Sequence, residues 1–201
     1  GNPKGVLYSH RSILLHTFGM LTFAADVGLT PSSTVLPVVP LFHANAWGLP
    51  FAVPLVGAKL VFPGAALDGA SLFSLMDKER VKAAWGVPTI WLGLLAEMRK
   101  QKRKPQEFSF MLSGGSAVPR SMIQELEKEF GVDVTHGWGM TECSPVGSTT
   151  TLGSQTKELS FDEKVELKTY QDRRMYTVDM RIVGEDGKLL PHDGKAFGEL
   201  Q

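Results

Sequence analysis

Apolar residues recur along this chain with a helical period in some segments and as short continuous runs in others. Ile13, Leu14 and Phe18 have helical spacing and predict a helix over residues 9–26. The β-branched run at 34–39 predicts a buried strand. By the same reasoning we expect further strands at 59–62, 83–87, 110–112 and 132–135, and helices at 68–80, 88–100 and 119–130. This alternation predicts an α/β fold, with a mainly parallel sheet flanked by helices.

The pattern changes after about residue 150. Ser160 and Glu163 form a capping box, which predicts a helix that continues to about residue 170. Residues 178–183 alternate like a strand, and Asp186-Gly187 predicts a type I′ hairpin turn, whose two central residues need positive φ. We therefore expect an α/β subdomain over 1–150. Residues 151–201 are expected to form a connecting helix and a C-terminal β-hairpin that starts a further small β subdomain.

Composition narrows the class of protein. Hydrophobic residues make up 43% of the 201, which is typical of a folded globular chain. Lys and Arg together number 21, as do Asp and Glu, so no basic excess points to nucleic acid. The single cysteine, Cys143, can form no internal disulfide, which favours a reducing, cytoplasmic setting. Both ends of the sequence read as the inside of a loop or strand, so we expect an internal fragment of a longer protein.

Two of the four segments with candidate chemistry lie in the first fifty residues. In the PKG segment (residues 3–5), Lys4 could meet a phosphate, although the sequence is no Walker A motif and a plain turn is the simpler interpretation. In the FHANAWG segment (residues 42–48), His43 could donate to a phosphate or carboxylate and Trp47 could form the wall of an apolar pocket. The alternative there is a core tryptophan beside a hydrogen-bonded histidine.

The other two segments follow later strands. The glycines of the SGGSAVP segment (residues 113–119) would let the backbone approach a flat or anionic ligand, or simply make a tight turn. In the GWGMTE motif (residues 137–142), Trp138 could present its face to a base and Thr141 could contact a phosphate. Glu142 could help to hold Mg²⁺, which takes one or two carboxylates together with phosphates. The alternative is a loop whose tryptophan packs into the core. His10, His16 and His192 lack metal-ligand spacing and are expected at the surface or as helix caps.

Taken together and in this order, the segments resemble the AMP-binding, acyl-adenylate-forming superfamily. The similarity runs through nearly the whole chain. The PKG segment looks like the end of that family's phosphate loop, and the GWGMTE motif looks like its adenine and Mg²⁺ motif. Residues 198–200 look like the start of its next motif. The FHANAWG segment and residues 55–59 are similar to medium- and long-chain fatty acyl-CoA synthetases.

The resemblance implies an ATP-dependent fatty acid–CoA ligase. In such enzymes a carboxylic acid attacks the α-phosphate of ATP to give acyl-AMP and pyrophosphate, and the thiol of CoA then displaces AMP. The implied catalytic residues are Thr141, Glu142 and His43, with Glu142 as the Mg²⁺ ligand. The implied acyl-binding residues are His43, Trp47 and Gly137. The implied nucleotide-binding residues are Lys4, Gly115, Ser116, Ala117, Gly137, Trp138, Gly139, Met140 and Thr141.

Some features leave alternatives open. Residues 170–174 depart from the glycine-containing segment expected in the family, which puts local contacts with the nucleotide in doubt. Two interpretations compete with the fatty acid–CoA ligase: another adenylate-forming enzyme, and an ATP-binding fragment without turnover. Because most of the phosphate loop, the ribose-binding Asp and the catalytic Lys of the family would lie outside this sequence, we expect the isolated chain to be inactive. The resemblance also allows a homodimer and a peripheral contact with membranes, neither of which the sequence demands.

Overall fold

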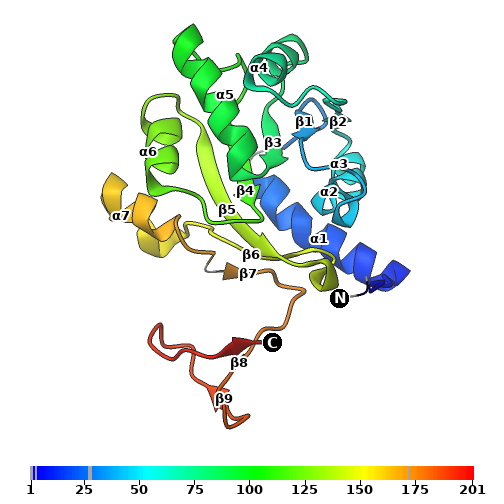
Figure 1. The fold of residues 1–201 in the computed structure, drawn as a ribbon, viewed down its shortest axis with the longest axis vertical. Helices are drawn as coiled ribbons and strands as arrows, with labels where there is room; N and C mark the ends of the chain where they lie inside the picture. The colour runs from blue at the N-terminus through cyan, green and yellow to red at the C-terminus, as the bar shows by residue number, and fades with distance from the viewer. Residues whose placement is uncertain (1, 3, 27–28, 172) are drawn as a thin grey trace.

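A seven-stranded sheet forms the body of the molecule, with helices on both of its faces (Figure 1). The computed structural model describes the chain except for residues 1, 3, 27–28 and 172. Helices α4, α5, α6 and α7 pack on one face, called here the α5 face, and α1, α2 and α3 pack on the other, called the α1 face. The helices are α1 (His10–Asp26), α2 (Ala44–Trp47), α3 (Leu49–Val56), α4 (Gly69–Lys78), α5 (Pro88–Gln101), α6 (Arg120–Lys128) and α7 (Phe161–Leu167).

The strand order is β2-β1-β3-β4-β5-β6-β7. The first five strands in this order pair in parallel. At the edge, β6 pairs antiparallel with β5, and β7 pairs antiparallel with β6. The predicted α/β class with a mainly parallel sheet is therefore confirmed, but the two antiparallel strands were not predicted. The strands of this sheet are β1 (Thr34–Pro37), β2 (Lys59–Leu60), β3 (Ala83–Gly86), β4 (Phe110–Gly114), β5 (Asp133–Gly139), β6 (Val146–Thr149) and β7 (Arg173–Arg174).

The C-terminal part forms a separate small antiparallel sheet of β8 (Ile182–Val183), β9 (Leu189–Leu190) and β10 (Glu199–Leu200). The predicted hairpin is present, but the strand expected over 178–183 covers only its last two residues. The predicted type I′ turn is wrong, because only Gly187 has positive φ, at 77°. The amide of Gly184 bonds the carbonyl of Lys188, so three residues lie in the loop and a single left-handed glycine suffices.

Helix starts follow the signals in the sequence. Ser9 accepts a hydrogen bond from the amide of Ser12 at 3.0 Å, so it caps α1 as expected. Ser160 and Glu163 form the predicted capping box at the start of α7. That helix ends at Leu167, earlier than the expected end near residue 170.

No helix in the described ranges is both long and apolar enough to cross a membrane.

His16 is buried rather than exposed or capping, which corrects the expectation from sequence. It lies on α1 with 4% of its surface exposed, and its Nε2 accepts a hydrogen bond from the amide of Val146 at 3.1 Å. A side chain at Gly48 would start 2.7 Å from the imidazole, so the ring fills the space beside that glycine. Burial lowers the pKa of His16 from 6.5 to about 4, which keeps the ring neutral and able to accept this bond.

We expect stability to fall as the pH drops from about 6.5 towards 4. The unfolded chain binds a proton on His16 throughout this window, whereas the folded chain does not, so acid favours unfolding. Between pH 7 and pH 5 this one group should cost about 2 kcal/mol of unfolding free energy. Urea unfolding of the whole protein at both pH values measures the loss. His16→Gln should reduce it and the exposed His192→Gln should not; equal losses in both variants would contradict the assignment.

Candidate functional site

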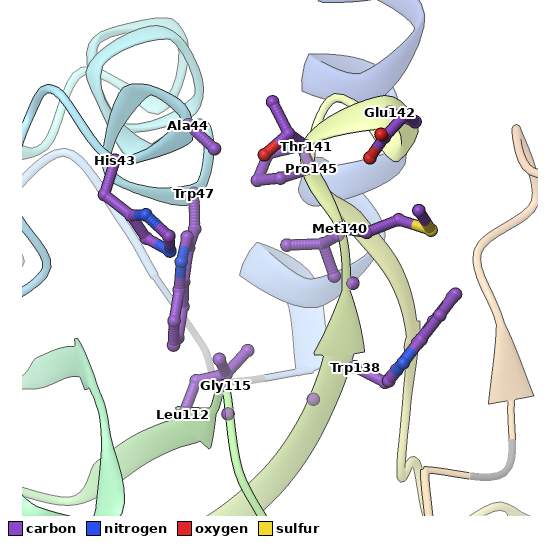
Figure 2. Close-up of a pocket in the computed structure, with 14 residues that line it drawn as sticks. His43, Ala44, Trp47, Leu112, Gly115, Trp138, Met140, Thr141, Glu142 and Pro145 are labelled. Carbon is purple, nitrogen blue, oxygen red and sulfur yellow. The ribbon is translucent and has the colours of Figure 1, made fainter. Parts of the chain in front are cut away.

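A cavity of about 330 Å³ opens where β4 and β5 end, at the carboxyl edge of the parallel strands (Figure 2). This edge is where ligands bind in open α/β sheets. Three of the four candidate segments meet there, and the fourth does not. The lining comprises His43, Ala44, Trp47, Leu112, Gly114, Gly115, Gly137, Trp138, Gly139, Met140, Thr141, Glu142, Pro145 and Val146.

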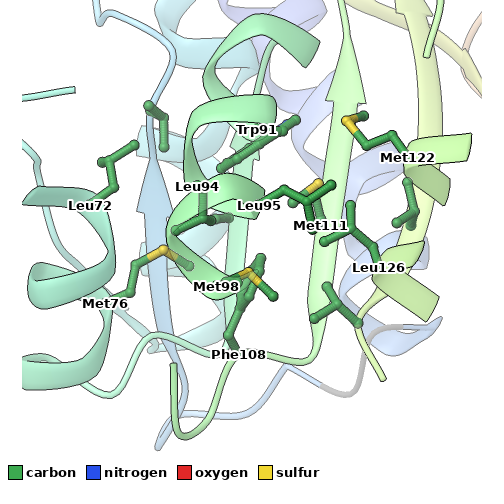
Figure 3. Packing of buried hydrophobic residues seen from close by; sticks show 14 of the residues in the cluster. Leu72, Met76, Trp91, Leu94, Leu95, Met98, Phe108, Met111, Met122 and Leu126 are labelled. Atoms are coloured by element: carbon green, nitrogen blue, oxygen red, sulfur yellow. The ribbon is translucent and has the colours of Figure 1, made fainter. Parts of the chain in front are cut away.

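The strands beneath the cavity are held by close packing on the α5 face. Trp91, Leu94 and Met98 of α5 lie over the sheet beside Met111 of β4, and all four are fully buried (Figure 3). Burying a large apolar side chain contributes about 1.5–3 kcal/mol. The ends of β4 and β5 are therefore fixed, and the cavity is built on rigid elements.

A short left-handed turn places Trp47 in the cavity wall. All four residues of α2 have positive φ, between 45° and 57°, although none is glycine. Each such residue costs about 1 kcal/mol or more, so the surrounding structure must hold the turn. Trp47 itself is 7% exposed and belongs to the core cluster of the α1 face. The resulting position puts both Trp47 and His43 on the same side of the β5 strand (Figure 2).

The first glycine of the SGGSAVP segment makes room for the neighbouring strand β5, and the second allows a left-handed backbone. A Cβ on Gly114 would lie 3.5 Å from Cη2 of Trp47 and 2.6 Å from the carbonyl oxygen of Gly137. Gly115 has φ of +78°, which favours glycine. Sequence reasoning assigned these glycines to ligand approach or a tight turn; the structure shows that Gly114 also admits the backbone of β5, with Trp47 at ordinary contact distance.

Trp138 lies on the other side of β5 from Trp47 (Figure 2). Its neighbours Gly137 and Gly139 are also part of the strand, so the expected strand 132–135 extends to residue 139 and the start of the GWGMTE motif is no loop. The pairing with β6 shifts between Trp138 and Gly139. A Cβ on Gly147 of β6 would lie 2.7 Å from the Trp138 ring, so that glycine leaves space for the indole.

The end of the motif forms a 3₁₀ turn, Thr141–Cys143, whose first two side chains are exposed at the rim of the cavity. In the described part of the chain, no three His, Cys, Asp or Glu residues cluster to hold a metal ion. An exposed Glu142 therefore fits a cation that takes its other ligands from water and phosphate, as Mg²⁺ does, and does not fit a closed metal site.

Three expected nucleotide-binding residues lie outside the cavity lining. Ser116 and Ala117 directly follow Gly115 and are exposed, and Lys4 is exposed near the N-terminal end. Pro3, its neighbour in the PKG segment, lies outside the described residues. The structure thus brings most of the candidate residues together at the cavity. The role of Lys4, Ser116 and Ala117 stays a prediction.

Tyr8 was not predicted as a site residue, yet it touches the motif. Its hydroxyl donates to the carbonyl oxygen of Thr141 at 2.5 Å, which joins positions 133 residues apart. The pKa of Tyr8 is raised by burial and, to a smaller extent, by the negative charge of Glu142. The Cys143 thiol also has a raised pKa, mainly through burial, and so stays neutral. No motif in the sequence marks Tyr8, since the contact depends on tertiary structure.

His136 was also missed. It is fully buried on the α5 face, where Nδ1 lies 3.1 Å from the carbonyl of Thr169 and Nε2 lies 2.7 Å from Nε2 of Gln171. Burial lowers its pKa, so the neutral ring donates from Nδ1 and accepts at Nε2. The imidazole therefore ties the segment after α7 to the strand that carries Gly137 and Trp138.

The structure is an α/β fold with a cavity at the carboxyl edge of a mainly parallel sheet. The chain belongs to the family of AMP-binding enzymes, whose family model matches residues 1–201. The resemblance inferred from the motifs is thereby confirmed.

The comparisons with individual proteins agree. The chain is 50% identical over 201 residues to a medium-chain-fatty-acid–CoA ligase of Ectopseudomonas oleovorans, covering 100% of this chain and 36% of the relative. It is 45% identical over 200 residues to a 3-methylmercaptopropionyl-CoA ligase of Ruegeria pomeroyi, covering 100% and 37%. The inhibitor-bound N-terminal domain of FACL13 from Mycobacterium tuberculosis has the same fold, with a TM-score of 0.80 at 22% identity over 100% of this chain and 46% of that chain. The chain thus spans about a third of the length of the curated relatives it matches.

We expect Tyr8→Phe to weaken ATP binding by the whole protein about fivefold, the equivalent of one hydrogen bond of about 1 kcal/mol. The Thr141–Cys143 turn would lose its tether, so Thr141 and Glu142 would be less well placed. Isothermal titration calorimetry measures the affinity. The matched control is Tyr170→Phe, whose ring is largely exposed. Equal affinities for ATP in the two variants would contradict a role for Tyr8 in this site.

Proposed function

We propose that the protein containing this chain is an ATP-dependent acid–CoA ligase that activates a fatty acid as acyl-AMP and transfers the acyl group to CoA. The observation that carries the proposal is the convergence of two unlike surfaces on one cavity. Trp47 and Leu112 provide an apolar wall, and the exposed Thr141 and Glu142 provide polar groups at its rim. The ligase names of relatives at 45–50% identity support the same reaction class.

The nucleotide would bind on the Trp138 side of β5. The indole would stack on the adenine, with the backbone at Gly115 and the exposed Ser116 and Ala117 around the base. Lys4 would close the phosphate loop from the N-terminal side. Thr141 would donate its hydroxyl to an oxygen of the α-phosphate. Residues Gly137, Gly139 and Met140 would contribute backbone contacts between these two ends of the nucleotide.

The acid would bind on the opposite side, against Trp47 and the backbone of Gly137 in the cavity lining. Burying its apolar tail there contributes about 25 cal/mol per Å². His43 faces the same space and would donate a hydrogen bond to the carboxylate or to the α-phosphate. Only the carboxyl end would then reach the polar rim, which brings the nucleophilic oxygen to the phosphorus.

The reaction requires the protein mainly to position the two reactants and to stabilise the charge that develops. The acid itself is the nucleophile, so no activated serine or cysteine is needed, and the neutral Cys143 has no part in it. Glu142 would hold Mg²⁺ together with phosphate oxygens; the bound ion would offset the charge that builds up as pyrophosphate leaves. Thr141 and His43 would stabilise the same charge by hydrogen bonds, and holding both reactants in line supplies much of the rate increase.

An amino-acid-activating enzyme is the second candidate within the same superfamily. It needs an acidic residue beside the substrate amine, and the acyl side of the described cavity offers apolar and small residues instead. An ATP-binding protein without turnover would bind the nucleotide and release no pyrophosphate. CoA as acceptor, a cytoplasmic location, a homodimer and a peripheral membrane contact remain predictions of the resemblance.

We expect fatty-acid-dependent exchange between ATP and pyrophosphate by the whole protein, reduced at least about 100-fold in Glu142→Gln. Loss of a group that stabilises developing charge has effects of this size. The measurement is exchange of labelled pyrophosphate with a panel of short, medium and long fatty acids and amino acids. The matched control is Glu158→Gln, an exposed carboxylate outside the cavity lining.

Exchange with amino acids alone would support an amino-acid-activating enzyme instead of a fatty acid–CoA ligase. ATP binding without exchange for any acid would refute the ligase assignment.

A further inference from the structure

A second cavity, of about 390 Å³, lies on the α1 face beside the edge strand β7. It contains no described carboxylate, and hydroxyl and guanidinium groups dominate its walls. These walls include Thr22, Thr149, Thr151, Arg173, Arg174 and Met175. Sequence analysis marked residues 170–174 as unlike the family pattern, and the function proposed above leaves this cavity without a role.

The strand register places the second cavity directly beside the first. Gly137 of β5 pairs with Thr149 of β6, and Thr149 pairs with Arg173 of β7. Paired residues point to the same face, so all three positions face α1, as Leu112 does. Two interstrand spacings separate Gly137 from Arg173, a distance of about 10 Å. This span lies within reach of a medium-length acid whose carboxyl group is at the first cavity.

The wall between the two cavities is thin and made of small or flexible side chains. Thr149 Cγ2 lies 3.7 Å from where a Cβ on Gly137 would stand, so only a methyl group adjoins the first cavity at this point. Met175 lies across Gly19 of α1, where a Cβ would be 2.5 Å from its Cε. An unbranched methionine side chain can change rotamer to admit a ligand. A chain that passes Gly137 would have to displace Thr149 and Met175 to enter the second cavity.

Three of the polar side chains of the second cavity are available to a ligand. Thr22 and Arg174 are engaged, by the carbonyl groups of Gly19 and Val178 respectively. The side chains of Thr149, Thr151 and Arg173 make no hydrogen bond or ion pair with any residue in the described ranges. An exposed guanidinium with two free hydroxyl groups nearby suits a carboxylate, which Arg binds through two parallel hydrogen bonds.

We propose that this cavity is a distal subsite for the far end of the acid, and that it selects acids with a second carboxylate at that end. The proposal rests on the ligase function proposed above and specifies its substrate class as medium-length dicarboxylic acids. One carboxylate lies at Thr141 and His43, where it attacks the α-phosphate. The other accepts hydrogen bonds from Arg173, Thr149 and Thr151 and is not consumed.

The test is direct binding of two matched acids, octanoate and octanedioate, to the whole protein in the presence of ATP and a non-reactive Mg²⁺ substitute such as Ca²⁺. Arg173→Gln removes the guanidinium and Thr149→Val removes a hydroxyl at nearly constant volume. We expect each to weaken octanedioate binding, about tenfold for Arg173→Gln, and to leave octanoate within twofold. The matched control is Arg181→Gln, an arginine that directly precedes β8 and whose side chain bonds Gln201.

Equal effects on both acids, or none on either, would overturn the proposal. Pyrophosphate exchange with the same acids separates the two proposals. Exchange with octanoate and no Arg173-dependent binding of octanedioate would refute the subsite and leave the ligase. Arg173-dependent binding of octanedioate without exchange for any acid would refute the ligase and, with it, the role of the cavity as an acyl subsite.

Discussion

The parallel, in-register pairing of β3, β4 and β5 is the constraint on which the rest of the structure depends. Every residue of β3 and β4 is buried, so both faces of these strands must be covered. The apolar clusters of the α5 and α1 faces provide this cover and leave the strands open only at their ends. Parallel pairing brings the carboxyl ends to one edge, which is why segments 70 to 100 residues apart in sequence meet at one cavity.

Close packing at two glycines adds a second constraint at that edge. Trp47 and Trp138 lie on opposite sides of β5. Gly114 leaves space for the carbonyl group of Gly137 in β5, and Gly147 leaves space for the ring of Trp138. The backbone of β5 lies between the Trp47 side and the Trp138 side of the cavity. A side chain at Gly114 would press on β5 itself and so affect both sides, whereas one at Gly147 would displace the indole of Trp138.

Much of the fold could be predicted from periodicity, because strands and helices of the α/β part differ clearly in apolar spacing. The antiparallel strand β6 was missed because Val146–Thr149 is short, contains a glycine and lacks an apolar run. The extension of β5 was missed because glycines around Trp138 are typical of loops. His16, His136 and Tyr8 could not be found at all, since their partners Val146, Gln171 and Thr141 are distant in sequence. The motif residues could be marked because their chemistry is local, and the structure brings most of them to one cavity.

The position of β5 between the two sides of the cavity has a consequence for how each side can change. The Thr141–Cys143 turn is tied by Tyr8, and β5 is tied by His136 to the segment after α7, in each case through a hydrogen bond to a residue distant in sequence. The Trp47 side is lined by side chains of α2, β4 and β6 that belong to one apolar cluster. Substitutions in that cluster alter the shape and polarity of the Trp47 side while β5 holds the turn in place. Under the proposed function, selectivity for the acid can therefore diverge within this fold while the geometry of the Thr141–Glu142 turn is kept.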